Sequence, residues 1–170
     1  MQPAPFMSVL LAVLAAAATA ESAELKLLSQ QLPPASYSGG EAQSRKGNEP
    51  DKAFDGRMDT AFCNGASYPA WIMVDLGASH SVIKTMTFME KPGTWYSYKI
   101  EVSPDQQTWT MFADQTKNQE PSEDPAYSDM GGVVGRYVRI TLTDARDRDK
   151  SWFWPVITEF QVWGVAVEKK

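Results

Sequence analysis

The sequence predicts an all-β fold, an eight-stranded β-sandwich that follows a cleaved signal peptide. After an apolar leader, the chain breaks into short runs rich in β-branched and aromatic residues, separated by clusters of Gly, Pro, Asn and Asp. Without the leader about 150 residues remain, which is the usual size of one domain and enough to bury a core. We therefore expect a single sandwich of two packed sheets.

The N-terminal segment has the layout of a secretory signal peptide. An apolar run extends from Phe6 to Ala18, and small residues precede the charged stretch that begins at Glu21. This run is shorter than the ~20 residues that cross a bilayer, and no later segment would do so. We expect cleavage after Ala20, or else after Ala23, and export to the periplasm or the extracellular space. A buried N-terminal helix is the alternative, since no Lys or Arg precedes the run.

Six segments have the pattern of strands with a buried face, and one or two weaker strands are expected before Asp55. The first of the six is expected to end at Gly77, because glycine interrupts strands. The predicted strands are residues 71–76, 82–89, 98–102, 109–112, 137–142 and 157–163. Long polar loops, where function usually lies in a sandwich, are predicted at residues 37–48, 64–69, 90–96, 116–132 and 144–155.

Composition excludes several classes of function. A net charge of −5 and a pI near 4.9 argue against nucleic acid and anionic lipid as partners, because both attract a basic surface. Cys63 is the single cysteine, so an internal disulfide is impossible, and we expect a small buried thiol. His80 is the single histidine, so a Ser–His or Cys–His mechanism would have to rest on it alone, and no zinc-binding histidine cluster exists. We therefore expect a binding module and not an enzyme.

Four blocks, in order, resemble the discoidin, or coagulation-factor-type C, domain. They are DKAFDGRMDTAF at 51–62, WIMVDLG at 71–77, IEVSPDQQTW at 100–109, and GRYVRI at 135–140 with ITEFQVWG at 157–164. The resemblance implies the galactose-binding-like jelly roll that this family shares with many bacterial carbohydrate-binding modules. The expected organisation is a signal peptide at 1–20, a lead-in segment at 21–36, the discoidin-like sandwich at 37–166 and a tail at 167–170.

Several residues within these blocks have expected roles in turns, in the core or in ion pairs. Asp55-Gly56 and Ser103-Pro104-Asp105 are expected to form tight turns, the second within a hairpin. Four aromatic residues are assigned to the core: Trp71, Trp109, Phe160 and Trp163. Arg136 and Arg139 are expected to pair with acidic neighbours or to line the sheet edge.

A calcium site is predicted at the Asp55 turn. Asp55 and Thr60 lie in one short loop, and Glu159 begins the last strand, which should run beside that loop. Asp59 is either a further ligand or a turn former. In similar modules a structural calcium is held here, and the resemblance implies these ligands: Asp55, Thr60 and Glu159, with backbone oxygens near Lys52 and Arg57. The alternative is a metal-free polar turn in which Asp55 accepts hydrogen bonds from backbone amides.

Aromatic residues in the loops predict a carbohydrate site, because planar rings stack on the apolar faces of sugars. The candidate ligand-binding residues are Trp95, Tyr96, Trp152 and Trp154, with polar groups from Glu90, Lys91, Asn64 and Tyr68. Galactose-binding members of the family typically carry a histidine and an arginine where this chain has Cys63 and Lys91. These two departures leave open whether the sugar is galactose. For Trp152 or Trp154 taken singly, a buried position at the end of the barrel is the alternative.

These observations rank the possible functions. Binding of a glycan or glycoconjugate comes first, through aromatic loops and with a structural calcium. Adhesion to a protein surface comes second. Membrane attachment comes last, because the chain is acidic and lacks the disulfide common in the animal branch of the family.

Overall fold

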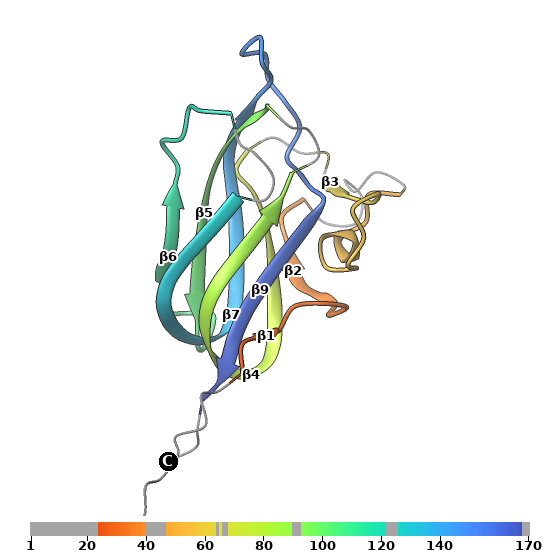
Figure 1. Cartoon of the computed structure of the whole chain (residues 1–170). Coiled ribbons are helices and arrows are strands. Elements are labelled where there is room, and N and C mark those ends of the chain that lie inside the picture. Colours follow the sequence, from red (N-terminus) through yellow and green to blue (C-terminus); the bar gives the residue numbers. More distant parts are fainter. Residues whose placement is uncertain are drawn as a thin grey trace, which may run out of the picture.

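The structure of the chain is a computed structural model, which describes residues 24–39, 47–63, 65, 68–89, 93–121 and 126–167 (Figure 1). The strands are β1 Lys26–Leu27, β2 Pro34–Tyr37, β3 Phe62–Cys63, β4 Ala70–Phe88, β5 Trp95–Ser103, β6 Thr110–Gln115, β7 Ala126–Arg146, β8 Val156–Ile157 and β9 Glu159–Ala166. A 3-10 turn, η2, spans Pro50–Ala53. The predicted all-β fold is confirmed, while the expected signal peptide lies outside the described residues. In the part of the chain described, no helix has the length and apolarity to cross a membrane.

Two long strands, β4 and β7, build the sandwich by running through both of its layers. The main sheet has the order β1-β9-β4-β7-β5-β6, and β2 pairs with β4 beside this path. The first half of β4 pairs with β2 and its second half with β9, while β7 follows β4 along most of its length. The strand was predicted to end at Gly77, but it continues through this residue, which has a φ of 77°. The register between β4 and β7 shifts there, between Asp75 and His80, and β4 continues.

The segment predicted to lead into the domain is part of the sheet. Lys26 pairs with Gly164 of β9, and Pro34 pairs with Val74 of β4. Between these strands, the buried Ser29 hydroxyl donates to the carbonyl oxygen of Phe160 at 3.2 Å. Backbone pairing thus includes parts of the expected lead-in segment, from Lys26 onward, in the sheet.

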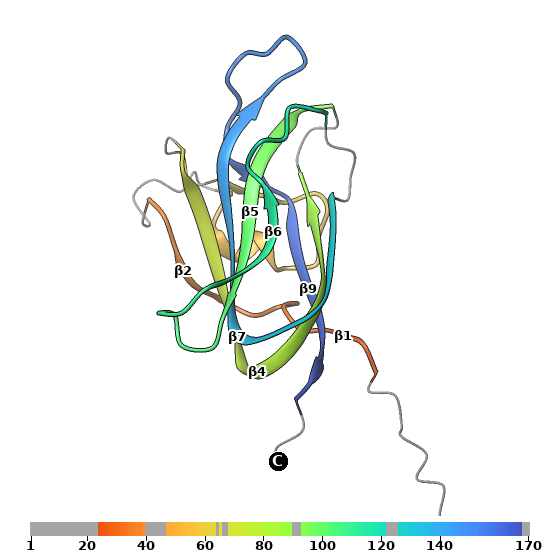
Figure 2. The ribbon, with the colours of Figure 1, turned by 90° about the vertical axis from the view of Figure 1, so that its left-hand side faces the viewer.

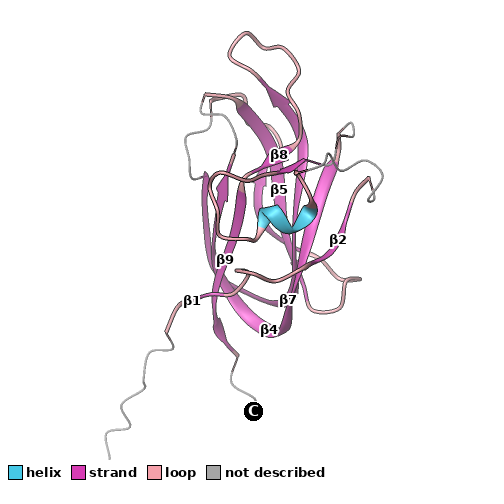
Figure 3. Cartoon of the chain, turned by 90° about the vertical axis from the view of Figure 1, so that its right-hand side faces the viewer, coloured by secondary structure: helices cyan, strands magenta, loops and turns pink. Residues whose placement is uncertain are grey.

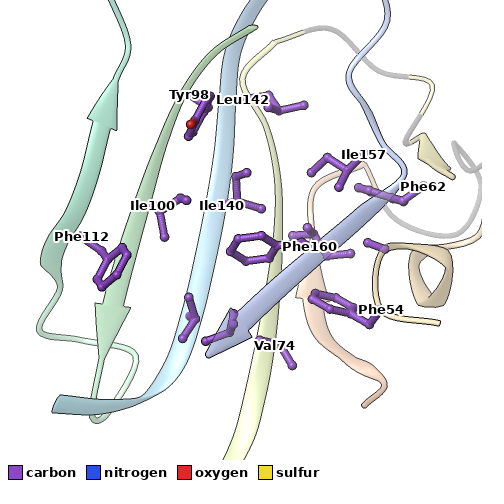
Figure 4. Packing of buried hydrophobic residues seen from close by; sticks show 14 of the residues in the cluster. Phe54, Phe62, Val74, Tyr98, Ile100, Phe112, Ile140, Leu142, Ile157 and Phe160 are labelled. Atoms are coloured by element: carbon purple, nitrogen blue, oxygen red, sulfur yellow. The ribbon is translucent and has the colours of Figure 1, made fainter. Parts of the chain in front are cut away.

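The core lies between the layers and is built from inward-facing residues of β4, β5, β7 and β9 (Figure 4). Phe160 is fully buried, as predicted, and its ring centroid lies 6.2 Å from that of Phe54. The other aromatic assignments are wrong. Trp71, Trp109 and Trp163 are only partly buried. Strand alternation turns Trp71 in β4 and Trp163 in β9 to the outer faces, and Trp109 lies just before the start of β6.

Cationic side chains cover two of these outer indoles. The Arg139 guanidinium lies 4.1 Å from the ring centroid of Trp109, and the Lys84 ammonium lies 4.8 Å from that of Trp163. Arg139 also donates to Glu101 at 2.9 Å. The bidentate pair between Arg136 and Asp75, at 2.6 and 2.7 Å, holds the pKa of Asp75 below its usual range. The predicted pairing of both arginines with acidic neighbours is confirmed.

The predicted hairpin between β5 and β6 is also confirmed. Asp105 Oδ1 accepts hydrogen bonds from the backbone amides of Gln107 at 2.9 Å and Thr108 at 2.7 Å. These bonds lower the pKa of Asp105.

Gly164 in β9 gives a first testable prediction, because a side chain there has no room. A Cβ atom would collide with the carbonyl oxygen of Ser81 and lie 2.9 Å from Leu28 Cδ1. Gly164→Ala is expected to lower the free energy of unfolding by about 3 kcal/mol, since backbone cannot yield cheaply. Urea denaturation measures this loss. Gly77→Ala is the control, with open space around the Cβ and only about 1 kcal/mol of backbone strain expected; equal losses would contradict the packing argument.

Candidate functional site

The Asp55 turn follows η2, which contacts β2, β3 and β9 on one side of the sandwich (Figure 3). Gly56 adopts a φ of 79°, which confirms the predicted tight turn. The Thr60 hydroxyl lies 2.9 and 3.1 Å from the two carboxylate oxygens of Asp55. The backbone amide of Arg57 donates to Asp55 Oδ1 at 2.9 Å. The short loop thus gathers a carboxylate and a hydroxyl around one point.

Glu159, the first residue of β9, brings a second carboxylate to this turn. The residue is fully buried, and its Oε2 accepts a hydrogen bond from the Gly56 amide at 3.1 Å. Its Oε1 is buried and has no hydrogen-bond partner among the described residues. Burial, together with the charge of Asp55, raises the pKa of Glu159 to about 7. Burying a carboxylate oxygen without a hydrogen-bond partner costs free energy, unless the oxygen is protonated or binds a cation.

The donor set suits a hard cation. Asp55, Glu159 and Thr60 supply oxygens only, which is the chemistry calcium prefers. No group of three or more His, Cys, Asp or Glu side chains that could hold a metal occurs among the described residues. A cation here would therefore also need backbone carbonyls, as expected near Lys52 and Arg57. Asp59 is not part of the cluster, because its exposed carboxylate pairs with the Arg57 guanidinium at 2.7 and 3.0 Å.

A group of aromatic side chains forms a second candidate site, which we call the aromatic platform: Tyr68, Trp152 and Trp154. The Trp152 ring centroid lies 4.7 Å from that of Trp154 and 6.1 Å from that of Tyr68. The Tyr68 hydroxyl donates to the carbonyl oxygen of Phe153 at 2.9 Å, and burial raises its pKa. Trp152 is 43% exposed. Trp154 is half-buried against a small cluster that includes the buried Cys63, so Trp152 offers the open face.

The other predicted ligand residues divide into three groups. Tyr96 is fully buried, with its ring edge-on to Phe153 at 6.3 Å between centroids. Its expected exposure in a loop is wrong, because β5 begins at Trp95 and strand alternation turns the next side chain inward. Trp95 is half-buried on the outer face. Three candidates, Asn64, Glu90 and Lys91, lie outside the described residues.

A basin of about 530 Å³ lies beside Trp95 on the outer face of β5 and β7. Its walls come from the segment after β6 and the loop after β7, and Figure 2 shows that loop above β5 and β6. Besides Trp95, the lining residues include Lys117, Asn118, Thr143, Asp144, Arg146 and Lys150. The sequence marked both segments as long polar loops, but gave no sign that they meet.

Comparison with known proteins found a matching family model and similar solved structures. The model of the F5/8 type C domain matches residues 34–160. The fold is similar to that of CpGH89CBM32-4, produced by Clostridium perfringens, in complex with GlcNAc-α-1,4-galactose. The TM-score is 0.69 at 21% identity, over 84% of this chain and 96% of that one. Among curated proteins, none matches this chain.

Two further structures are similar. Chitosan-binding module 1, derived from a chitosanase/glucanase of Paenibacillus sp. IK-5, gives a TM-score of 0.66 at 26% identity, over 82% of this chain and 99% of that one. CBM32-3 from a family 31 glycoside hydrolase of Clostridium perfringens gives a TM-score of 0.66 at 16% identity, over 81% of this chain and 94% of that one. These likenesses confirm the jelly roll that the four sequence blocks predicted.

Proposed function

Because the chain belongs to the F5/8 type C domain family, we propose that it is a non-catalytic module that binds a glycan through the aromatic platform. The observation that carries this proposal is the exposed face of Trp152, which stands edge-on to Trp154 and Tyr68. A rigid indole of this kind can stack on the C–H face of a pyranose ring. The carbohydrate complex of one structurally similar module, and the description of another as a chitosan-binding module, support the same function.

A structural calcium is part of the proposal. Asp55, Thr60 and Glu159 would hold it with nearby backbone carbonyls, and the buried Glu159 Oε1 supports this assignment. Bound there, the ion would neutralise both carboxylates and tie the start of β9 to the turn after η2. The same turn lies far along the chain from Glu159, so this tie would close a long loop.

Export is the third part of the proposal. The apolar N-terminal run followed by small residues supports secretion to the periplasm or the extracellular space. An extracytoplasmic location would bring the module to polysaccharides and glycoconjugates. N-terminal sequencing of the secreted protein tests it, with residue 21 or 24 expected as the new N-terminus.

Glycan binding is tested with the mature domain on a glycan array and by affinity electrophoresis in polysaccharide gels. Trp152→Ala is expected to weaken binding by about 10- to 100-fold, because it removes the stacking surface at the centre of the platform. Trp109→Ala is the matched control, since that indole lies under Arg139 on the β5–β7 face. If the wild-type domain binds no carbohydrate, or if both variants bind as well as the wild type, the proposed function is wrong.

A further inference from the structure

The basin beside Trp95 has a charge opposite to that of the whole chain. Its lining includes the cationic Lys117, Arg146 and Lys150 and one acidic residue, Asp144, although the chain has a net charge of −5. Arg146 Nε donates to Asp144 Oδ2 at 2.9 Å, so this carboxylate is already neutralised. Among the described residues, no carboxylate forms an ion pair with Lys117 or Lys150. Two ammonium groups therefore remain available to an anion.

The basin also has an apolar wall next to these charges. The Lys150 ammonium lies 5.4 Å from the ring centroid of Trp95, and Trp95 is half-buried at the start of β5. The ammonium lies over the ring, so a sugar that packs its C–H face against this indole has a cation within reach of its substituents. The volume, about 530 Å³, is that of a pocket for a small ligand.

Hydrogen bonds fix the floor and one wall of the basin before any ligand arrives. The Asn118 amide donates to the carbonyl oxygens of Tyr96 at 3.1 Å and Glu120 at 3.0 Å. The Ser97 hydroxyl donates to the Asn118 carbonyl at 2.9 Å, and the Thr143 hydroxyl donates to the Ser97 carbonyl at 3.0 Å. These bonds attach the segment after β6 to β5 and β7, so little ordering remains to be done on binding.

The basin adjoins the aromatic platform. Arg146, which lines the basin, forms an isolated β-bridge with Trp152 of the platform. A glycan seated on Trp152 can therefore extend a neighbouring residue toward Trp95.

We propose that the basin lined by Trp95, Lys117, Arg146 and Lys150 binds the carboxylate-bearing residue of an acidic glycan, a uronic acid. The carboxylate lies between the two free ammonium groups, and the pyranose ring lies against Trp95. This inference rests on the proposed glycan binding and deepens it, because it names the class of sugar.

The test compares two probes with one backbone: α-1,4-trigalacturonic acid and its trimethyl ester, which lacks the charges. Isothermal titration with the mature domain is expected to give binding of the acid about tenfold tighter than of the ester, and weaker with rising salt. In the double variant Lys117→Gln/Lys150→Gln, affinity for the acid is expected to fall about tenfold, to the level of the ester. Lys84→Gln is the matched control, because Lys84 also lies over an indole, that of Trp163, in the other layer.

The outcomes separate this inference from the proposed function. Equal affinity for acid and ester, or an unchanged affinity of the double variant, overturns the acidic-sugar assignment. If neither trigalacturonide binds while a neutral glycan binds in a Trp152-dependent way, the assignment also fails and glycan binding stands. If no carbohydrate of either kind binds, the proposed function itself fails.

Discussion

Removing the proposed calcium ion is expected to lower the Tm of the domain, and to lower it more at about pH 8 than at about pH 5.5. Glu159 carries the effect, because in the calcium-free fold its buried carboxyl group has a pKa of about 7. The unfolded chain has the ordinary value of 4.5. Between these values the folded state binds more protons than the unfolded state, so stability is full below the lower pKa and is lost as the pH rises through the higher one.

The size of the effect follows from the two pKa values. Between about pH 5.5 and pH 8 the calcium-free domain should lose roughly 2 kcal/mol, or on the order of 5–8 °C in Tm. Calcium at a hundredfold excess over its Kd adds about 2.7 kcal/mol, and it does so at the higher pH, where the carboxylate is ionised. Differential scanning calorimetry with EDTA and with calcium, at both pH values, measures the loss of Tm with pH and the gain of Tm with calcium.

Glu159→Gln is the control for this experiment, because it keeps the shape of the side chain and removes its titration. In EDTA this variant is expected to show a smaller fall in Tm between the two pH values than the wild type, and calcium should raise its Tm little. A wild-type Tm that neither EDTA nor calcium changes at pH 8 would contradict the calcium site. A pH dependence equal in both proteins would contradict the role of Glu159.

Truncation of Phe160 is expected to have the largest effect on stability of any single aromatic residue of β9. Phe160→Ala should cost about 3–5 kcal/mol, because its ring is fully buried and fills the space between the layers beside Phe54. Domains of this size have about 5–15 kcal/mol in total, so the variant should unfold at much lower urea concentration. The midpoint and the slope of the urea transition measure the loss.

Trp163→Ala, three residues along the same strand, is the comparison. The larger indole is only partly buried, under Lys84, so its removal should cost about 1 kcal/mol. A core position for both residues, which the sequence suggested, predicts losses of similar size. Equal destabilisation by the two variants would therefore contradict the position of Trp163 in the structure.

Residues with a local or pairwise cause were predictable from the sequence. Gly56 takes a positive φ because the DG turn requires it, and Asp105 caps its hairpin for the same local reason. An acidic neighbour was among the expectations for Arg136, and the structure identifies it as Asp75. The cluster of Asp55, Thr60 and Glu159 came instead from the family resemblance, which supplied the contact between distant parts of the chain.

The burial of several aromatic residues was predicted wrongly, because burial depends on where a strand begins and on what covers its outer face. A shift of one position turns Tyr96 into the core and Trp95 out of it, and the sequence did not show that β5 begins at Trp95. The hydrophobicity of Trp109 suggests a place in the core, but in the structure the Arg139 guanidinium covers its ring on the outer face. The basin was missed because Lys117 and Lys150 meet only through the packing of two loops.

The antiparallel pairing of β1 with β9 decides how this module can be attached to anything else. Lys26 lies opposite Gly164, so the described chain enters and leaves at one pole of the sandwich, and the loop that follows β7 lies at the other (Figure 1). A linker or a fused domain joined at either terminus would thus lie at the pole opposite the loop that follows β7. The indole of Trp152 would still point outward, free to meet a surface.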